Sequence, residues 1–222
     1  MTTSAVIPSL PLGTTASVTV IGVAGPPGAG KSTLVRALVA ALADASAVYM
    51  DDYQRITQRT VAEIAQLLQG STDFNALHIP LLPEHLLALK QGQAVIDPVR
   101  LMRIEPRSVI VLETHFGRAH HATGQYIDYL VWLATPPDVA LARNVRDLVG
   151  SMLHDPHVQP SRSMVSALDA YLANYLGPVR ALAQAQRERI APDANCVVDA
   201  SADTDGAVQI VLAGWRAWRA NA

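Results

Sequence analysis

Short apolar runs alternate along the chain with longer segments in which apolar residues recur at helical spacing. Apolar runs bounded by turn residues predict buried strands, and helical spacing predicts amphipathic helices. The predicted strands are 18–24, 48–50, 109–112, 129–133 and 196–198. The predicted helices are 32–44, 60–69, 83–91, 137–149, 161–189 with a bend near Gly177 and Pro178, and 205–219.

This alternation predicts an α/β fold in which a mostly parallel sheet is covered by helices on both faces. Residues 1–16 are expected to form a flexible N-terminal segment, and residues 17–222 a single domain. Ligands bind such sheets outside the carboxyl ends of the strands. Polar residues follow three of the predicted strands there: a glycine-rich loop, the pair Asp51 and Asp52, and Glu113 with its successors.

Composition narrows the class of protein. Half of the 222 residues are hydrophobic, which is enough for a large core, and the net charge is −2. A nucleic-acid-binding protein would need clustered Lys and Arg, so no nucleic acid is expected as a partner. One cysteine cannot form an internal disulfide, and this fits a cytoplasmic protein. No apolar run approaches the roughly 18 residues that span a membrane, so no membrane is expected as a partner.

The loop after the first predicted strand carries the strongest motif. Residues 25–32 match the pattern G-x-x-x-x-G-K-[ST] in full, between a predicted strand and a predicted helix. Glycines let successive N–H groups point at phosphate oxygens, Lys31 supplies a positive charge, and Ser32 supplies a hydroxyl to Mg²⁺. The alternative is a glycine-rich turn with a chance Lys-Ser. The predicted nucleotide-binding residues are Gly25, Pro26, Pro27, Gly28, Ala29, Gly30, Lys31, Ser32 and Thr33.

This loop predicts a P-loop NTPase fold, which several protein classes share. Switch GTPases need a guanine-reading Asn-Lys-x-Asp, and this sequence has none. The chain is short for a motor or a transporter ATPase, and it lacks a Leu-Ser-Gly-Gly signature. Small-molecule kinases remain.

An ordered set of further segments resembles the uridine kinase and phosphoribulokinase family, which also contains bacterial pantothenate kinase. The resemblance covers about residues 18–200. It implies a kinase domain with a small helical lid at about 143–163, and it leaves a homo-oligomer open. The matching segments are 23–33, 49–55, 73–76, 81–92, 97–99, 105–107, 112–113, 141–147 and 171–178.

The resemblance places the chemistry on acidic residues that follow strands. Asp51 matches the general base, which takes the proton of the acceptor hydroxyl. Asp52 could serve instead, or could hold a metal-bound water; both acids could also be simple helix caps or turn residues. Glu113 is expected to orient Mg²⁺ through water. The expected cofactors are therefore ATP and Mg²⁺.

Basic and aromatic residues complete the predicted site. Arg143 and Arg146 are spaced i, i+3 on one helix face, so together with Lys31 they are predicted to stabilise the transferring phosphoryl group. A solvated helix face is the alternative, and Arg162 is a weaker additional candidate. The predicted acceptor-binding residues are Asp51, Tyr53, Arg55, His115 and Arg118.

Three departures from the family lie on the acceptor side or in the lid. The segment 100–104 is too short for the family's substrate hairpin, Thr114 stands where the family has glycine, and 151–157 lacks the basic lid tip. We therefore expect ATP-dependent phosphoryl transfer to a hydroxyl of a small metabolite, a nucleoside such as uridine or a sugar. The alternative is a nucleotide-binding regulator or an ATPase without a small-molecule acceptor.

Overall fold

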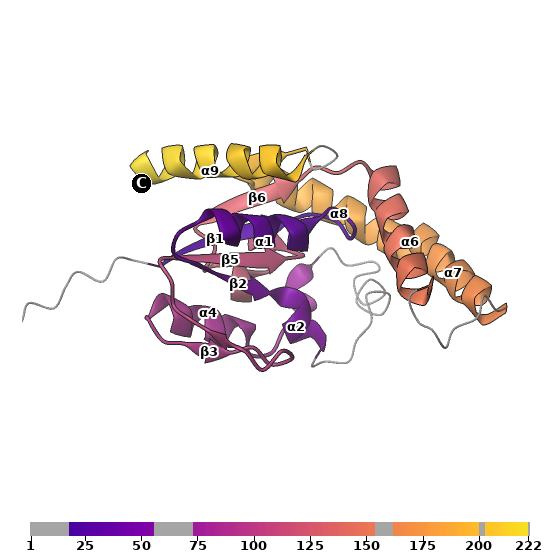
Figure 1. The fold of residues 1–222 in the computed structure, drawn as a ribbon, viewed down its shortest axis with the longest axis horizontal. Coiled ribbons are helices and arrows are strands. Elements are labelled where there is room, and N and C mark those ends of the chain that lie inside the picture. Colours follow the sequence, from indigo (N-terminus) through magenta and orange to yellow (C-terminus); the bar gives the residue numbers. More distant parts are fainter. Residues whose placement is uncertain (1–17, 56–72, 154–161, 200–202, 222) are drawn as a thin grey trace, which may run out of the picture.

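The computed structural model describes residues 18–55, 73–153, 162–199 and 203–221. A parallel sheet of five strands runs through the centre of the molecule, in the order β2-β5-β1-β6-β7 (Figure 1). This confirms the predicted α/β fold. The strands are β1 (Thr19–Ala24), β2 (Ala45–Tyr49), β5 (Val109–Thr114), β6 (Tyr129–Leu133) and β7 (Cys196–Val198).

Helices cover both faces of the sheet, as predicted (Figure 1). On one face lie α1 (Lys31–Ala41) and α9 (Thr204–Asn221), whose apolar residues share a buried cluster. On the other face lie α4 (Leu82–Lys90) and α8 (Arg180–Ile190). Strand β5 contributes to both clusters, because alternate residues of a strand point to opposite faces. Its residues therefore read as a continuous apolar run, which is typical of a parallel strand buried on both sides.

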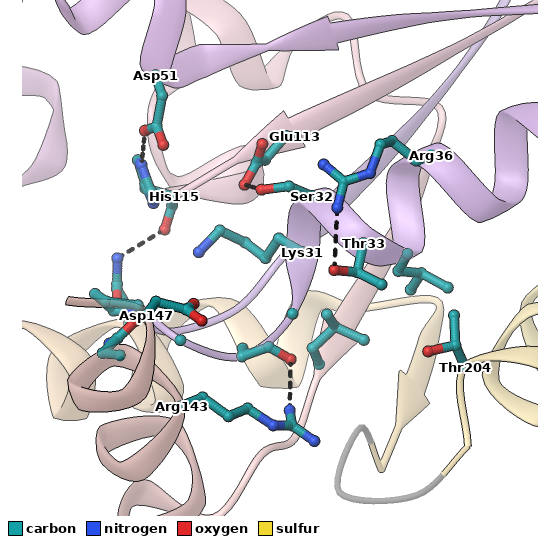
Figure 2. Close-up of a pocket in the computed structure, with 18 of the residues that line it drawn as sticks. Lys31, Ser32, Thr33, Arg36, Asp51, Glu113, His115, Arg143, Asp147 and Thr204 are labelled. Atoms are coloured by element: carbon teal, nitrogen blue, oxygen red, sulfur yellow. Dashed lines mark hydrogen bonds and ion pairs between the residues drawn. The ribbon is translucent and has the colours of Figure 1, made fainter. Parts of the chain in front are cut away.

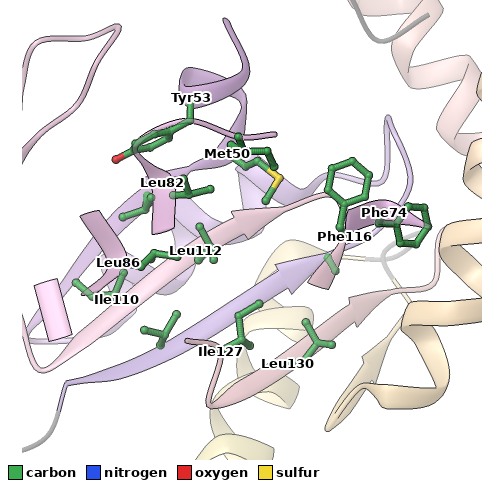
Figure 3. Packing of buried hydrophobic residues seen from close by; sticks show 14 of the residues in the cluster. Met50, Tyr53, Phe74, Leu82, Leu86, Ile110, Leu112, Phe116, Ile127 and Leu130 are labelled. Carbon is green, nitrogen blue, oxygen red and sulfur yellow. The ribbon is translucent and has the colours of Figure 1, made fainter. Parts of the chain in front are cut away.

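A buried hydrophobic cluster fills the space between the sheet and helices α4 and α8 (Figure 3). Ile110 and Leu112 of β5 lie within it, and both are fully buried. At its edge the rings of Phe74 and Phe116 pack with their centroids 5.1 Å apart. Met50, the residue that precedes Asp51, is also fully buried there. The core therefore fixes the backbone from which the first predicted acid projects.

Shorter elements connect the layers. Helices α6 (Pro137–Leu153) and α7 (Arg162–Asn174) lie beside the sheet, at one end of the molecule (Figure 1). Strands β3 and β4 form a small antiparallel pair near α4. The remaining elements are α2 (Met50–Arg55), η1 (Phe74–Ala76), β3 (Val95–Ile96), β4 (Arg103–Ile104), η2 (Gly117–Ala119), α5 (His121–Gly124), η3 (Tyr175–Val179) and η4 (Ala191–Asp193).

The structure changes some predicted boundaries. The second strand ends at Tyr49 and Met50 begins α2, so Asp51 and Asp52 lie in the first turn of a helix. The first helix ends at Ala41, whereas the prediction extended it to 44. The predicted bend is confirmed, since Gly177 has non-helical backbone angles (φ −94°, ψ −110°) between α7 and α8. The helix predicted for 60–69 lies outside the described residues.

Within the residues that the structure describes, every helix is too short or too polar to cross a bilayer.

Candidate active site

The glycine-rich loop joins β1 to α1, at the carboxyl end of the central strand. Lys31 begins α1, and only 5% of it is exposed. Its Nζ donates hydrogen bonds to the carbonyl oxygens of Gly25 (3.0 Å) and Pro26 (3.1 Å). The lysine therefore folds back across the loop. Its ammonium group lies where phosphate oxygens held by the loop and the helix N-terminus would meet it.

Burial lowers the pKa of Lys31, because a charged amine loses hydration inside the protein. The negative charges of Glu113 and Asp51 act in the opposite direction and raise this pKa. A polyphosphate bound in the loop would add further negative charge beside the amine. The site is therefore suited to an anionic ligand that stabilises the ammonium form.

Gly28 has a left-handed backbone (φ +78°), and a Cβ there would lie 2.3 Å from the carbonyl oxygen of Ala140. We expect Gly28→Ala to weaken MgATP binding at least about 10-fold, because both the loop and helix α6 have to shift. Isothermal titration calorimetry with MgATP measures this loss. Gly92→Ala is the matched control, since Gly92 has the same φ of +78° with no atom within 4 Å of its Cβ position. If both variants bind MgATP as the natural chain does, the loop does not hold the nucleotide.

Ser32 of α1 and Glu113, near the carboxyl end of β5, contact each other. The Ser32 hydroxyl donates a hydrogen bond to Oε1 of Glu113 over 2.9 Å (Figure 2). Glu113 is 4% exposed and lies in β5, where it pairs with Val23 of the neighbouring β1. A serine hydroxyl and a carboxylate are oxygen ligands of the kind that Mg²⁺ prefers. The residues present therefore fit the predicted metal.

Asp51 and His115 form a second polar pair. Nε2 of His115 lies 2.5 Å from Oδ1 of Asp51, which is half-exposed (Figure 2). The backbone of His115 is held as well: its carbonyl oxygen accepts a hydrogen bond from Nε2 of Gln186 (3.0 Å), and its N–H points at the sulfur of Met50 (3.4 Å). The imidazole therefore fixes the position of the carboxylate.

These groups line a single cleft with a volume of about 710 Å³, which is within the usual range for small-molecule sites. In Figure 2, Asp51, His115 and Asp147 lie toward one end of this cleft, and Thr33, Arg36 and Thr204 lie toward the other. Lys31 and the pair Ser32–Glu113 lie between the two groups. This arrangement places the phosphate loop between two parts of the cleft.

Helix α6 packs against the phosphate loop and contributes to the wall of the cleft. Nη1 of Arg143 donates a hydrogen bond to the carbonyl oxygen of Ala29 over 3.5 Å (Figure 2). Arg146 and Asp147 also line the cleft, and both are exposed. The i, i+3 spacing of the arginines, read from the sequence, therefore does place both side chains on the cleft side of the helix.

Comparison with known proteins decides the class. Residues 20–150, more than half of the chain, match the model of the phosphoribulokinase / uridine kinase family. The chain belongs to this family. The match includes the phosphate loop, Asp51, Glu113 and the two arginines of α6, and it ends before α7. No curated protein is similar enough in sequence to count as a match.

A solved structure of a small-molecule kinase shares the fold of this family member. A shikimate kinase from Aquifex aeolicus is 14% identical with a TM-score of 0.51, over 92% of this chain and 100% of that chain. A possible uridine kinase from Bacillus stearothermophilus is 16% identical with a TM-score of 0.48, over 83% and 90%. At such low identity the likeness to the shikimate kinase shows the α/β fold alone.

Several residues that the sequence predicted for the site do not line the cleft. Asp52 is 1% exposed and its carboxylate pairs with Arg100 over 2.7 Å, so it is directed away from the cleft. Tyr53 is fully buried, and its hydroxyl lies 2.9 Å from Nδ1 of His85. Neither residue is brought together with Lys31 and Asp51. The side chains of Arg55 and Arg162 lie outside the described part of the structure.

Arg118 does not line the cleft and instead holds neighbouring segments together. Its guanidinium donates hydrogen bonds to the backbone carbonyls of Ile127 and Asp128 and to Oδ1 of Asn195, over 2.7 to 3.1 Å. Asn195 immediately precedes β7, and its side chain also accepts a hydrogen bond from the N–H of Leu130. Arg118 therefore ties the loop after β5 to the far edge of the sheet. An arginine with this many fixed partners has little capacity for an acceptor.

Other cleft residues were not predicted. Some of them could have been found from sequence signals. Asn144 and Asp147 follow Arg143 on the same predicted helix. On α8, Leu182, Gln186 and Ile190 recur every four residues, so a glutamine interrupts a buried apolar stripe. The residues near Thr204 carry no motif. The cleft residues that sequence analysis missed are Leu34, Arg36, Gln54, Leu133, Asn144, Asp147, Leu182, Gln186, Asp203, Thr204 and Ala207.

Proposed function

We propose that this chain is an ATP-dependent kinase that transfers the γ-phosphoryl group to a hydroxyl of a small metabolite, a nucleoside or a sugar. One observation carries the proposal: Lys31, the pair Ser32–Glu113 and Asp51 line the same cleft, in a member of a family of phosphotransferases. A phosphate-binding loop alone serves many functions. A carboxylate that faces it across a cleft is what phosphoryl transfer to an alcohol requires in addition.

In this proposal the loop binds the phosphates of ATP, and the nucleoside part extends toward Thr33, Arg36 and Thr204. Lys31 leaves the carbonyls of Gly25 and Pro26 and contacts the phosphate oxygens. Ser32 and Glu113 hold Mg²⁺. When bound, this ion offsets the negative charge of the phosphate oxygens.

The acceptor enters at the end of the cleft where Asp51 and His115 lie. Asp51 accepts the proton of the acceptor hydroxyl, whose oxygen forms a bond to the γ-phosphorus while the bond to the leaving ADP oxygen breaks. His115 holds the carboxylate in place through its Nε2. The charge that develops on the phosphoryl group is stabilised by Lys31 and by Arg143 and Arg146 of α6.

We further propose that α6 is part of a lid that excludes water during transfer, which limits wasteful hydrolysis of ATP. Its residues Arg143 and Arg146 line the cleft beside the phosphate loop. The remainder of the predicted lid, beyond residue 153, includes residues that the structure does not describe. The proposal also includes a cytoplasmic location, which is inferred from the composition. It leaves a homo-oligomer open, as the family resemblance does.

The test is ADP release from MgATP in the presence of nucleosides, sugars, sugar phosphates and pantothenate, one at a time. Strong stimulation by one compound is expected, and it would name the acceptor. A chain that binds MgATP tightly but releases no ADP with any acceptor would instead be a nucleotide-binding regulator. ADP release that depends on an added protein would identify an ATPase.

A further inference from the structure

The connection between β6 and α6 contacts the phosphate loop at two points. β6 ends at Leu133 and α6 begins at Pro137, so Thr135 lies within this short connection. The Thr135 hydroxyl donates a hydrogen bond to the carbonyl oxygen of Ala29 over 3.1 Å. Near the start of the loop, a Cβ added to Gly25 would lie 3.1 Å from the Cβ of Leu133. The connection therefore supports the loop near both of its ends.

The sheet holds this connection in place. The N–H of Ala134 donates a hydrogen bond to the carbonyl oxygen of Val198 in β7 over 2.8 Å, so backbone pairing continues up to the residue before Thr135. Thr135 is 7% exposed, and Ala29 is fully buried. A buried carbonyl oxygen needs a hydrogen-bond donor, and Thr135 supplies one from a fixed position. The phosphate loop is thereby joined to the rigid part of the molecule.

Peptide geometry carries this contact to the phosphate site. The peptide bond between Ala29 and Gly30 is trans, and in a planar trans peptide the C=O and N–H point in opposite directions. The direction of the Gly30 N–H is therefore set by the partner of the Ala29 carbonyl. Gly30 precedes the first residue of α1 and has a left-handed backbone (φ +93°). In the proposed function its N–H is one of the loop groups that bind phosphate.

Helix α6 shares the same carbonyl oxygen. Nη1 of Arg143 reaches the Ala29 oxygen over 3.5 Å, a longer contact than that of Thr135 (Figure 2). A carbonyl oxygen can accept both bonds, because it has two lone pairs. In the proposed function Arg143 turns to the transferring phosphoryl group, and Thr135 then keeps the buried oxygen paired. A buried acceptor that loses its donor is unfavourable, so Thr135 removes a cost that would oppose this movement.

We infer that Thr135 is a positioning residue for nucleotide binding, which holds the Ala29 carbonyl and so directs the Gly30 N–H at the phosphates. This inference rests on the proposed binding of MgATP by the loop and deepens that part of the proposed function. Thr135 does not line the cleft, so it acts through the loop and not by contact with the ligand. Its removal should weaken the binding of the nucleotide and leave the binding of the acceptor unchanged.

The test compares Thr135→Val, which keeps the shape of the side chain and removes the donor, with Thr135→Ser, which keeps the hydroxyl. Isothermal titration calorimetry should show that Thr135→Val raises the Kd of MgATP about 3- to 10-fold, the factor expected for one neutral hydrogen bond. Thr135→Ser should recover most of this affinity. In steady-state kinetics the KM of the acceptor should stay the same with both variants. If Thr135→Val does not fold, Thr135→Cys serves instead, because a thiol is a weak donor.

Thr123→Val is the matched control for the loss of a buried threonine hydroxyl. Thr123 is fully buried, its Oγ1 lies 2.8 Å from Nδ1 of His120, and it does not line the cleft. This variant should unfold at a lower temperature and keep the Kd of MgATP.

The outcomes separate the inference from the proposed function. Unchanged MgATP binding by Thr135→Val, or an equal loss with Thr135→Ser or Thr123→Val, would overturn the inference and leave the kinase intact. A loss confined to Thr135→Val, in a chain that phosphorylates no acceptor, would support the inference and overturn the kinase. A natural chain that does not bind MgATP would overturn both.

Discussion

Lys31→Ala should lower the rate of acceptor-stimulated ADP release by about 10²- to 10³-fold, because the transferring phosphoryl group loses a preorganised positive charge. The lysine is buried, and its amine donates hydrogen bonds to the backbone carbonyls of Gly25 and Pro26. Removing it also removes the cost of burying an ammonium group. The variant is therefore expected to stay folded. Steady-state kinetics and thermal unfolding measure the two effects.

Lys90→Ala is the control for the removal of a lysine. Its Nζ pairs with Asp128 over 2.6 Å, and neither residue lines the cleft. This variant is expected to keep its rate of turnover and to lose a little stability, since both partners are partly exposed. Full turnover by purified Lys31→Ala would show that the phosphates bind elsewhere.

Asp51→Asn should lower kcat by about 10²- to 10⁴-fold, the range expected when a general base is removed. The amide still reaches His115, so the local structure is kept, but it cannot accept the acceptor's proton. The KM for MgATP should change little, because Asp51 lies at the acceptor end of the cleft. Rapid mixing of the variant with MgATP and acceptor separates binding from the chemical step.

Asp52→Asn is expected to change stability and not kcat, the opposite of Asp51→Asn. The Asp52 carboxylate is buried against Arg100, which is about half-exposed. Its loss should reduce the free energy of unfolding by about 1–3 kcal/mol, as for a hydrogen bond to a charged group, and should leave kcat unchanged. Chemical denaturation measures the first effect. A variant pair in which Asp52→Asn loses kcat and Asp51→Asn retains it would reverse the assignment of the base.

The sequence predicts the central strands well because they are buried on both sides. The runs at 109–112 and 129–133 contain almost no polar residue, and both form central strands. The phosphate loop is equally visible, since its glycines and Lys31 follow from local geometry alone. Membership of the family and the parallel α/β fold could therefore be stated before any coordinates.

Side-chain direction could not be predicted in the same way. Asp51 and Asp52 are adjacent, and only the start of α2 at Met50 decides which faces the cleft. Tyr53 follows on the same helix and turns into the core. Arg118 lies near Glu113 in sequence, but it is held by groups that come from distant segments, including Asn195. Such contacts depend on tertiary packing, about which local sequence carries little information.

The order of the strands has a consequence for synthesis of the chain. β1 and β2 are consecutive in sequence, but β5 lies between them in the sheet. Val109, the start of β5, lies 60 positions after Tyr49, the end of β2. At about 5–20 residues per second, a ribosome needs roughly 3–12 s to cover that distance. During this interval two apolar strands wait for their common neighbour, so the nascent chain should require protection from aggregation until β5 emerges.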